Sequence, residues 1–157
     1  MDIYRVVVGV DGSAESIRAL RWAAREVAAR GGALSVVAAW NWDGPSLAKP
    51  PLGVNPGQVR AHTEGLLAAA LDGVREAVPT VSVTAEAIQG YAPSVLVAAA
   101  KDADLLVLGS HGYGRLHHAV LGSVSEYCVR HATCPVVVIP TTMVETSGKP
   151  AGLATAG

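Results

Sequence analysis

The sequence predicts an α/β fold in which a doubly wound sheet of five parallel strands is covered by four helices. Two observations lead to this class. Short runs rich in valine and leucine alternate with longer segments whose apolar residues recur at helical spacing. The chain of 157 residues also has the length of one domain. Strands that alternate with helices in this way form a parallel sheet, in the strand order 3-2-1-4-5 or 2-1-3-4-5.

The first half of the chain supplies two strands and a helix. Residues 4–10 form a Val-rich run that ends at a turn, and Ser13 is a suitable N-cap for the segment that follows. In that segment, apolar residues keep helical spacing until Gly31. Residues 34–40 are expected to form the second strand. Residues 43–57 contain four prolines and three glycines, which predicts a loop.

The second half continues the alternation. A long helix over residues 58–77 is expected to stop before Pro79. The further expected elements are a strand over 81–88, a helix over 94–101, a strand over 105–108, a helix over Ser123–His131 and a strand over Val136–Ile139. Residues 1–140 are thus expected to form a single domain. Residues 141–157, rich in Thr, Gly and Ala, are expected to be a disordered tail.

Composition and charge exclude several classes of protein. Half of the residues are hydrophobic, which is too many for an intrinsically disordered chain. The formal net charge of −1 provides no basic excess of the kind that nucleic acids or anionic membranes attract. No apolar run has the length of a membrane span, and the first residues lack the pattern of a signal peptide. The spacing of Cys128 and Cys134 indicates two buried thiols rather than a disulfide, and a cytoplasmic protein is expected.

The main functional signal is a glycine-rich segment that follows the fourth expected strand. Its glycines, Gly109, Gly112 and Gly114, permit a close approach of the backbone to a ligand. The segment then opens a helix at Gly122 and Ser123, and the N-terminus of a helix attracts anions, phosphate above all. In the strand order 3-2-1-4-5, this segment lies where the winding reverses, which is where ligands bind.

Several details of this segment narrow its chemistry. Ser123 and Glu126 have the spacing of a capping box, and the hydroxyl groups of Ser123 and Ser125 would add donors for phosphate. The segment contains no lysine, so it is not a Walker A motif. Arg115 is its permanent cation. These features favour a phosphate-containing ligand that is held by backbone amides.

The chain resembles the universal stress proteins of the ATP-binding type. That subgroup has the pattern Gly, two residues, Gly, nine residues, Gly-Ser/Thr, and Gly109, Gly112 and Gly122-Ser123 match it. The resemblance runs from residue 4 to residue 140. It includes the opening Val-Val-Val-Gly-Val-Asp-Gly-Ser and the closing His-Ala-Thr-Cys-Pro-Val-Val-Val-Ile.

The resemblance implies a Rossmann-like sheet in the order 3-2-1-4-5, with ATP in the cleft where the winding reverses. It also implies a homodimer formed through the last strand, Val136–Ile139, and a regulatory role in stress response through a protein partner that the sequence does not identify. By the same resemblance, Asp11 binds the ribose or the adenine edge, and Ala39 lines the adenine pocket. The residues expected to bind the nucleotide are Gly9, Asp11, Gly12, Ser13, Ala39, Leu108, Gly109, Ser110, His111, Gly112, Gly114, Arg115, Gly122, Ser123, Val124 and Ser125.

Three other activities are weighed against an ATP-binding module. A zinc site is not expected, because His117 and His118, as an adjacent pair on an irregular loop, do not converge readily with His111 on one ion. Phosphoryl transfer needs a cationic clamp, a metal-binding carboxylate and a placed nucleophile. Arg115 and a water-bridged Mg²⁺ at Asp11 would supply part of this, but no general base is evident. A slow ATPase, and a binder of cyclic AMP or FMN, therefore stay open as alternatives.

Overall fold

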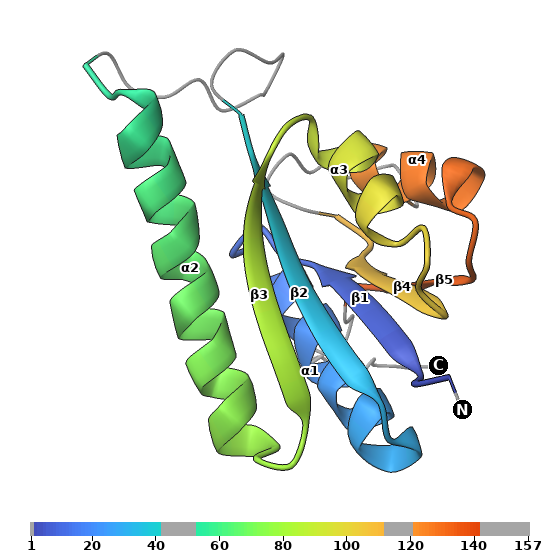
Figure 1. Cartoon of the computed structure of the whole chain (residues 1–157). Coiled ribbons are helices and arrows are strands. Elements are labelled where there is room, and N and C mark those ends of the chain that lie inside the picture. The colour runs from blue at the N-terminus through green and yellow to red at the C-terminus, as the bar shows by residue number, and fades with distance from the viewer. Residues whose placement is uncertain (1, 42–52, 112–120, 142–157) are drawn as a thin grey trace, which may run out of the picture.

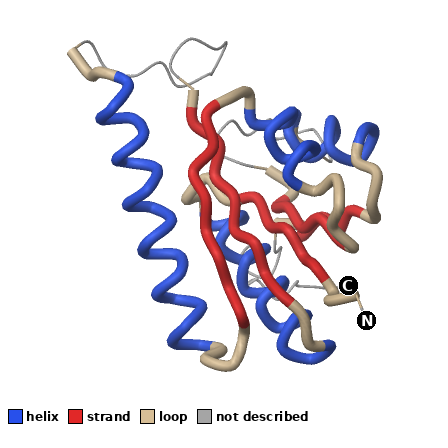
Figure 2. The backbone as a smooth tube through the Cα atoms, viewed as in Figure 1, coloured by secondary structure: helices blue, strands red, loops and turns tan. Residues whose placement is uncertain are grey.

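The computed structural model describes residues 2–41, 53–111 and 121–141 of the chain (Figures 1 and 2). Its elements are β1 (Arg5–Gly9), α1 (Ala14–Arg30), β2 (Ala33–Trp40), α2 (Pro56–Ala77), β3 (Ser82–Gln89), α3 (Ala92–Ala99), β4 (Leu105–Gly109), α4 (Ser123–His131) and β5 (Val136–Ile139). All neighbouring strands are parallel, and their order is β3-β2-β1-β4-β5. The expected α/β class is confirmed, and the order is 3-2-1-4-5 rather than 2-1-3-4-5.

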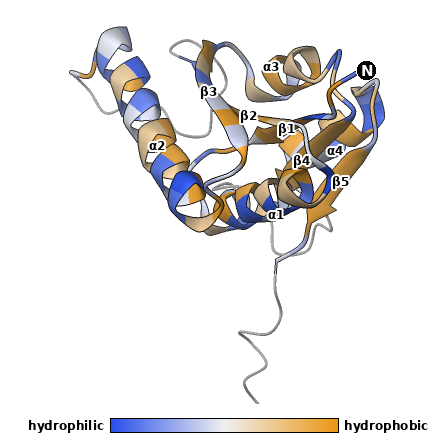
Figure 3. Ribbon diagram, turned by 60° about the horizontal axis from the view of Figure 1, so that its bottom comes forward, coloured by the Kyte–Doolittle hydropathy of each residue, from blue (hydrophilic) through white to orange (hydrophobic). Residues whose placement is uncertain are grey.

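The helices cover the sheet from two sides (Figures 1 and 3). On one face, α1 lies over β1 and β4, and α2 lies over β2 and β3. On the other face, α3 and α4 pack against each other. Right-handed crossovers keep successive helices on one face until the chain reverses its direction across the sheet. Here it reverses between β1 and β4, so these two central strands are neighbours.

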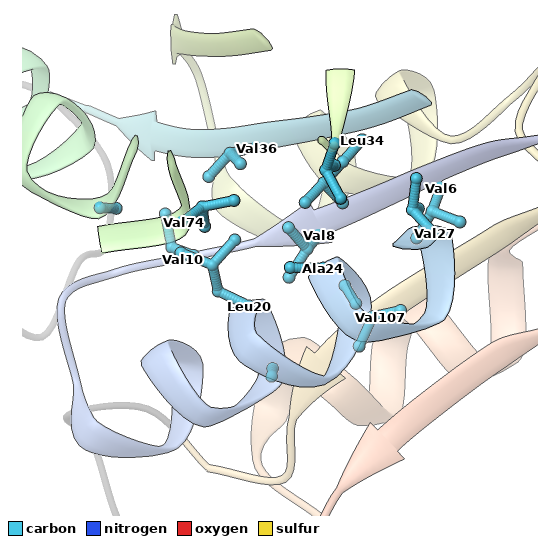
Figure 4. Packing of buried hydrophobic residues seen from close by; sticks show 14 of the residues in the cluster. Val6, Val8, Val10, Leu20, Ala24, Val27, Leu34, Val36, Val74 and Val107 are labelled. Atoms are coloured by element: carbon cyan, nitrogen blue, oxygen red, sulfur yellow. The ribbon is translucent and has the colours of Figure 1, made fainter. Parts of the chain in front are cut away.

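The larger core lies between the sheet and the helices α1 and α2 (Figure 4). Alternate side chains of the central strands point to this face, and they meet apolar residues of α1 that recur at helical spacing. The buried residues labelled in Figure 4 are Val6, Val8, Val10, Leu20, Ala24, Val27, Leu34, Val36, Val74 and Val107. Because the core uses small and branched side chains, the helices lie close to the sheet.

A smaller core lies on the opposite face, under α3 and α4. Val7 of β1 and Leu106 of β4 point to it, whereas their neighbours Val6 and Val107 point to the larger core. The central strands are therefore buried on both faces. This explains why their sequences read as continuous apolar runs rather than as alternating ones.

Two helices begin earlier than the sequence predicts. The helix α2 begins at Pro56 rather than at residue 58, because Asn55 and Gln58 form a capping box. The Gln58 N–H donates to Asn55 Oδ1 at 3.0 Å, and the Asn55 N–H donates to Gln58 Oε1 at 2.8 Å. The expected loop over 43–57 is therefore wrong at its end. Similarly, α3 starts at Ala92, two residues before its expected start, with Pro93 in its first turn.

Further expectations concern the cysteines, the tail and membranes. Cys128 and Cys134 are both free; Cys128 is buried and Cys134 is half-buried. The expected tail lies outside the described residues, apart from Thr141. Over residues 2–41, 53–111 and 121–141, no helix combines the length and the apolar character that a membrane span requires.

Candidate functional site

A pocket opens at the carboxyl ends of β1 and β4, the two strands between which the winding of the sheet reverses. This is the place where open α/β sheets bind ligands. Its volume is about 120 Å³. The residues that line it are Gly9, Val10, Asp11, Ser13, Ser16, Val37, Ala39, Ala92, Leu96, Leu108, Gly109, His111 and Val124.

The turn between β1 and α1 forms a polar wall of the pocket. The Ser13 N–H donates a hydrogen bond of 2.9 Å to Asp11 Oδ1, and the Ser16 N–H donates one of 3.2 Å to the Ser13 hydroxyl oxygen. Ser13 is thus the N-cap of α1, as predicted. Gly12 has a φ of +86°, a left-handed conformation that favours glycine. Together these features hold the exposed Asp11 carboxylate beside the pocket.

The carbonyl oxygen of Ser110 joins the end of β4 to the start of α4. It accepts a hydrogen bond of 2.6 Å from the Gly122 N–H and one of 2.9 Å from the Ser125 hydroxyl. Ser110 and Ser125 are both buried. The Ser125 hydroxyl also lies 3.1 Å from the carbonyl oxygen of Gly122. The Ser125 hydroxyl proton is therefore donated to a backbone oxygen of the protein, and this hydrogen bond positions the first turn of α4.

The helix α4 begins at the pocket without a side-chain cap. Its N-cap is Gly122, and no described side chain forms a capping hydrogen bond there. The predicted capping box of Ser123 and Glu126 is wrong, because Ser123 is already the first helical residue and Glu126 pairs with Arg130 at 3.1 Å. The amides of a first helical turn have no acceptor within the helix. Among the described residues, α1 and α2 have side-chain caps, whereas α3 and α4 have none, so the first amides of α4 are open to an acceptor from outside the described part of the helix.

The remaining walls of the pocket are apolar. Gly9 of β1 pairs with Val37 of β2, but β2 and β3 continue together for three further residues, to Trp40 and Gln89. This extension brings Ala39 to the pocket. Side chains from α3 and β4 complete the wall, namely Ala92, Leu96 and Leu108.

Two glycines are required by the packing of the protein itself. A Cβ atom on Gly9 would lie 2.9 Å from side-chain carbons of Leu96 and Leu108. A Cβ atom on Gly109 would lie 3.0 Å from the carbonyl carbon of Glu15. Gly9 thus makes room for two side chains that line the pocket, and Gly109 lets β4 approach the first turn of α1.

One histidine, His111, is among the described residues that line the pocket. Its Nδ1 atom lies 3.2 Å from the Ser110 hydroxyl oxygen. In the part of the chain that the structure describes, no three His, Cys, Asp or Glu side chains come together as metal ligands. His117 and His118 lie outside that part.

The sequence-predicted residues fall into three groups. Those that line the pocket are Gly9, Asp11, Ser13, Ala39, Leu108, Gly109, His111 and Val124. Those that belong to the adjoining turn or to the start of α4, without lining the pocket, are Gly12, Ser110, Gly122, Ser123 and Ser125. Those that lie outside the described residues are Gly112, Gly114 and Arg115.

Sequence reasoning missed five lining residues, four of them apolar. The residues that it did not predict are Val10, Ser16, Val37, Ala92 and Leu96. A signal for the last two was present, because the helix after the third strand must start at the same edge of a parallel sheet. Ala92 and Leu96 are four positions apart in that helix, so they lie on one face of it.

Comparison with known proteins identifies relatives of the whole domain. The chain matches the model of the universal stress protein family over residues 3–140. Universal stress protein Rv2005c of Mycobacterium tuberculosis is 40% identical over 139 residues, which cover 85% of this chain and 47% of that protein. Universal stress protein Rv2623 of the same organism is 38% identical over 142 residues, which cover 85% and 46% respectively. The chain spans about half the length of the curated relatives it matches.

Solved structures share the fold. A universal stress protein whose crystal structure was determined in complex with cAMP has a TM-score of 0.68 and 28% sequence identity, and the match covers 90% of this chain and 100% of that one. A universal stress protein family member from Burkholderia pseudomallei has a TM-score of 0.65 and 25% identity, over 88% and 97% of the two chains.

Proposed function

The chain belongs to the universal stress protein family, and on that premise we propose that it is a regulatory module that binds ATP in the pocket between β1 and β4. The observation that carries the proposal is the start of α4. Val124 lines the pocket, and the first turn of α4 has amides that no described side chain caps. A helix N-terminus in this state binds phosphate through its amides and its dipole.

The spacing of the glycines supports a triphosphate rather than a single phosphate. Gly109, Gly112 and Gly122-Ser123 match the pattern of the ATP-binding subgroup. The structure places Gly109 at the end of β4 and Gly122 directly before α4. In the proposal, the segment between them follows the phosphate chain, and Arg115 contributes its charge there.

The opposite wall suits a purine base. Ala39, Leu96 and Leu108 present an apolar surface, and the Asp11 carboxylate stands beside it, held by its bond from Ser13. An aromatic base gains from an apolar surface, and a carboxylate accepts hydrogen bonds from ribose hydroxyls. The relative that was solved with cAMP supports an adenine nucleotide, and it makes cyclic AMP the second candidate ligand.

Mg²⁺ and hydrolysis are secondary parts of the proposal. Asp11 is the acidic side chain among the described lining residues, so phosphate oxygens and water would supply most ligands of a Mg²⁺ ion. A slow ATPase remains the alternative. Steady release of phosphate from ATP, abolished by mutation of the pocket, would favour it over a binding module.

The proposed working unit is residues 1–140, paired as a homodimer in the cytoplasm. The edge strand β5 has four aliphatic residues, all of them half-buried, and it pairs on one side only with β4. An apolar edge of this kind is a natural seam for a second copy. Two free cysteines suit a reducing compartment. Transmission of a stress signal would then pass through a further protein partner.

Direct recovery of the nucleotide tests the ligand. Freshly purified protein is denatured with acid, and its supernatant is examined by mass spectrometry. Titration calorimetry of the emptied protein with ATP, cyclic AMP and GTP follows. We expect recovered ATP or tighter binding of ATP than of the other two. Stronger binding of cyclic AMP would identify that nucleotide as the ligand of the pocket instead of ATP. If none of the three nucleotides binds, the proposal is refuted.

A substitution at Val124 tests the phosphate position. Val124 is half-buried, and Val124→Glu places a carboxylate where the phosphates should bind, so ATP affinity should fall by at least about tenfold. Val124→Gln has similar size without the charge and should retain most of the affinity. Val129→Glu is the control, because it adds the same charge on the exposed surface of the same helix, at a residue that does not line the pocket. Gly122 is less suitable, because a Cβ there would lie 3.1 Å from the Ser110 carbonyl oxygen.

A further inference from the structure

A second and larger hollow is lined by residues of α1 and α2. These two helices lie on the face of the sheet opposite to α3 and α4 (Figure 3). We call this hollow the α1–α2 groove. Its volume is about 860 Å³. The residues that line it are Gly12, Ile17, Leu20, Arg21, Ala24, Arg25, Leu66, Ala69, Ala70, Gly73, Val74, Glu76, Ala77 and Val78.

The groove exists because α1 and α2 lie over different strands and because α2 has small side chains on the side facing α1. Ala69, Gly73 and Ala77 recur every four residues along α2, and all three are exposed. A Cβ atom on Gly73 would meet nothing within 4 Å. Leu20 and Val74 are buried and form part of the floor. The result is an apolar floor with room above it.

The rim of the groove is charged, and unevenly so. All but three of the lining residues are aliphatic, alanine or glycine, and the exceptions are Arg21, Arg25 and Glu76. Arg21 and Arg25 are exposed, one helical turn apart on α1, and form no ion pair with any described residue. Arg30 and Arg60 pair with a glutamate on their own helix at 2.7 Å, whereas Arg18 and Arg75, like the two rim arginines, form no ion pair with a described residue. Within the described part of the chain, the α1 rim therefore offers two positive charges that no carboxylate neutralises.

We propose that the α1–α2 groove binds an amphipathic helix of a partner protein, with acidic side chains facing α1. At a rise of 1.5 Å per residue, the lining residues span about 12 Å of α1 and about 17 Å of α2, the length of two to three helical turns. A helix with an apolar stripe would bury it on the floor, as helix-in-groove complexes do. Its acidic side would meet Arg21 and Arg25, which fixes its orientation.

The groove shares no lining residue with the proposed ATP pocket. The first turn of α1 stands between the two sites. Ser13 and Ser16 line the pocket, whereas Gly12 and Ile17 line the groove. Binding of a helix in the groove can therefore be measured in protein that has been emptied of nucleotide.

Nuclear magnetic resonance with two designed peptides tests the proposal. The probe is a helical peptide of three to four turns with Leu and Ala on one side and Glu beside them. The control peptide has Lys at each Glu position. With the full chain labelled with ¹⁵N, the acidic peptide should shift amides of Ala24, Gly73 and their neighbours in the groove, and the basic peptide should not. The proposal is overturned if the acidic peptide shifts none of these amides, or if both peptides shift them equally.

Variants on each rim complete the test. Arg21→Glu/Arg25→Glu should weaken binding of the acidic peptide by about tenfold or more. Arg75→Glu changes charge on α2 at a position that does not line the groove, and it should leave binding unchanged. Gly73→Glu should also weaken binding, because it places a larger and negatively charged side chain in the groove, whereas Gly73→Ala adds only a Cβ, which meets nothing within 4 Å, and should not. A dimer that Arg21→Glu/Arg25→Glu converts to a monomer would place a second copy in the groove and overturn the proposal.

Discussion

The hydroxyl group of Ser125 donates a hydrogen bond of 2.9 Å to the carbonyl oxygen of Ser110, fifteen residues earlier in the chain. The same oxygen accepts the bond from the Gly122 N–H. One buried atom at the end of β4 thus holds the first turn of α4 at two points. Since the amides of that turn are the proposed phosphate donors, their position depends on a side chain that does not itself line the pocket.

Ser125→Ala should therefore lower both stability and ATP affinity. The loss of a buried hydrogen bond should reduce the free energy of unfolding by about 1 to 2 kcal/mol. Removal of one anchor of α4 should weaken ATP binding at the same time. Urea denaturation and titration calorimetry measure the two effects. Ser123→Ala, at the exposed first position of the helix, should change the free energy of unfolding by less than about 0.5 kcal/mol. Equal stability of the two variants would contradict this role of Ser125.

Gly109→Ala should destabilise the fold. Its Cβ would lie 3.0 Å from the carbonyl carbon and the Cβ of Glu15, both in the first turn of α1. Backbone atoms cannot rotate away as a side chain can, so α1 must shift, at a cost of about 1 to 3 kcal/mol in unfolding free energy. The midpoint of urea denaturation checks this. An unchanged midpoint would show that β4 and α1 are not in such close contact.

Gly73→Ala should have the opposite effect. Gly73 lies within α2, is exposed, and has open space where a Cβ would be placed. Alanine in an exposed helix interior is favoured over glycine by about 1 kcal/mol, because it restricts the unfolded chain more. Thermal denaturation followed by circular dichroism should show a higher Tm. A lower Tm would indicate that the groove closes over Gly73 in solution.

The fold could be predicted well from the sequence because its strands are buried on both faces. Continuous apolar runs such as the one through Val6, Val7 and Val8 are typical of central parallel strands. The residues alone allow two strand orders, since both obey the same handedness rule, and only the resemblance selects one of them. The start of α2 was missed because Asn55 lies among prolines and glycines, which are typical of a loop. Asn55 and Gln58 nevertheless have the spacing of a capping box.

The candidate site could be located from the sequence, but the role of each residue could not. At Gly9 and Gly109, a Cβ atom would lie 2.9 to 3.0 Å from atoms of the protein itself, so internal packing is also a reason for glycine at these two positions. Ser125 was expected to donate to phosphate, and its proton is used by the backbone of Ser110. Such assignments depend on which atoms meet in three dimensions, and spacing in the sequence does not contain that information.

The last prediction concerns Cys128, which lies on α4 and is buried in the smaller core. Burial raises the pKa of its thiol from 9.0 to about 11, because the thiolate would be desolvated. In the unfolded chain the thiol loses its proton near the lower value. Between these two values the folded chain binds more protons than the unfolded chain, so the free energy of unfolding falls as the pH rises. The loss of unfolding free energy over this range is on the order of 2 to 3 kcal/mol.

Urea denaturation at about pH 8 and about pH 11 measures this loss. Burial also raises the pKa of Cys134 and of Tyr4, so some pH dependence will remain in any Cys128 variant. Cys128→Ala should be less stable than the wild type at the lower pH, because it leaves a small cavity. Its further loss of stability at the higher pH should be smaller than that of the wild type, since the buried thiol no longer titrates. Cys134→Ala should retain most of the wild-type dependence, because Cys134 is only half-buried. If wild type and Cys128→Ala lose the same amount, the Cys128 thiol ionises as readily in the folded chain as in the unfolded one, and the core under α4 admits water.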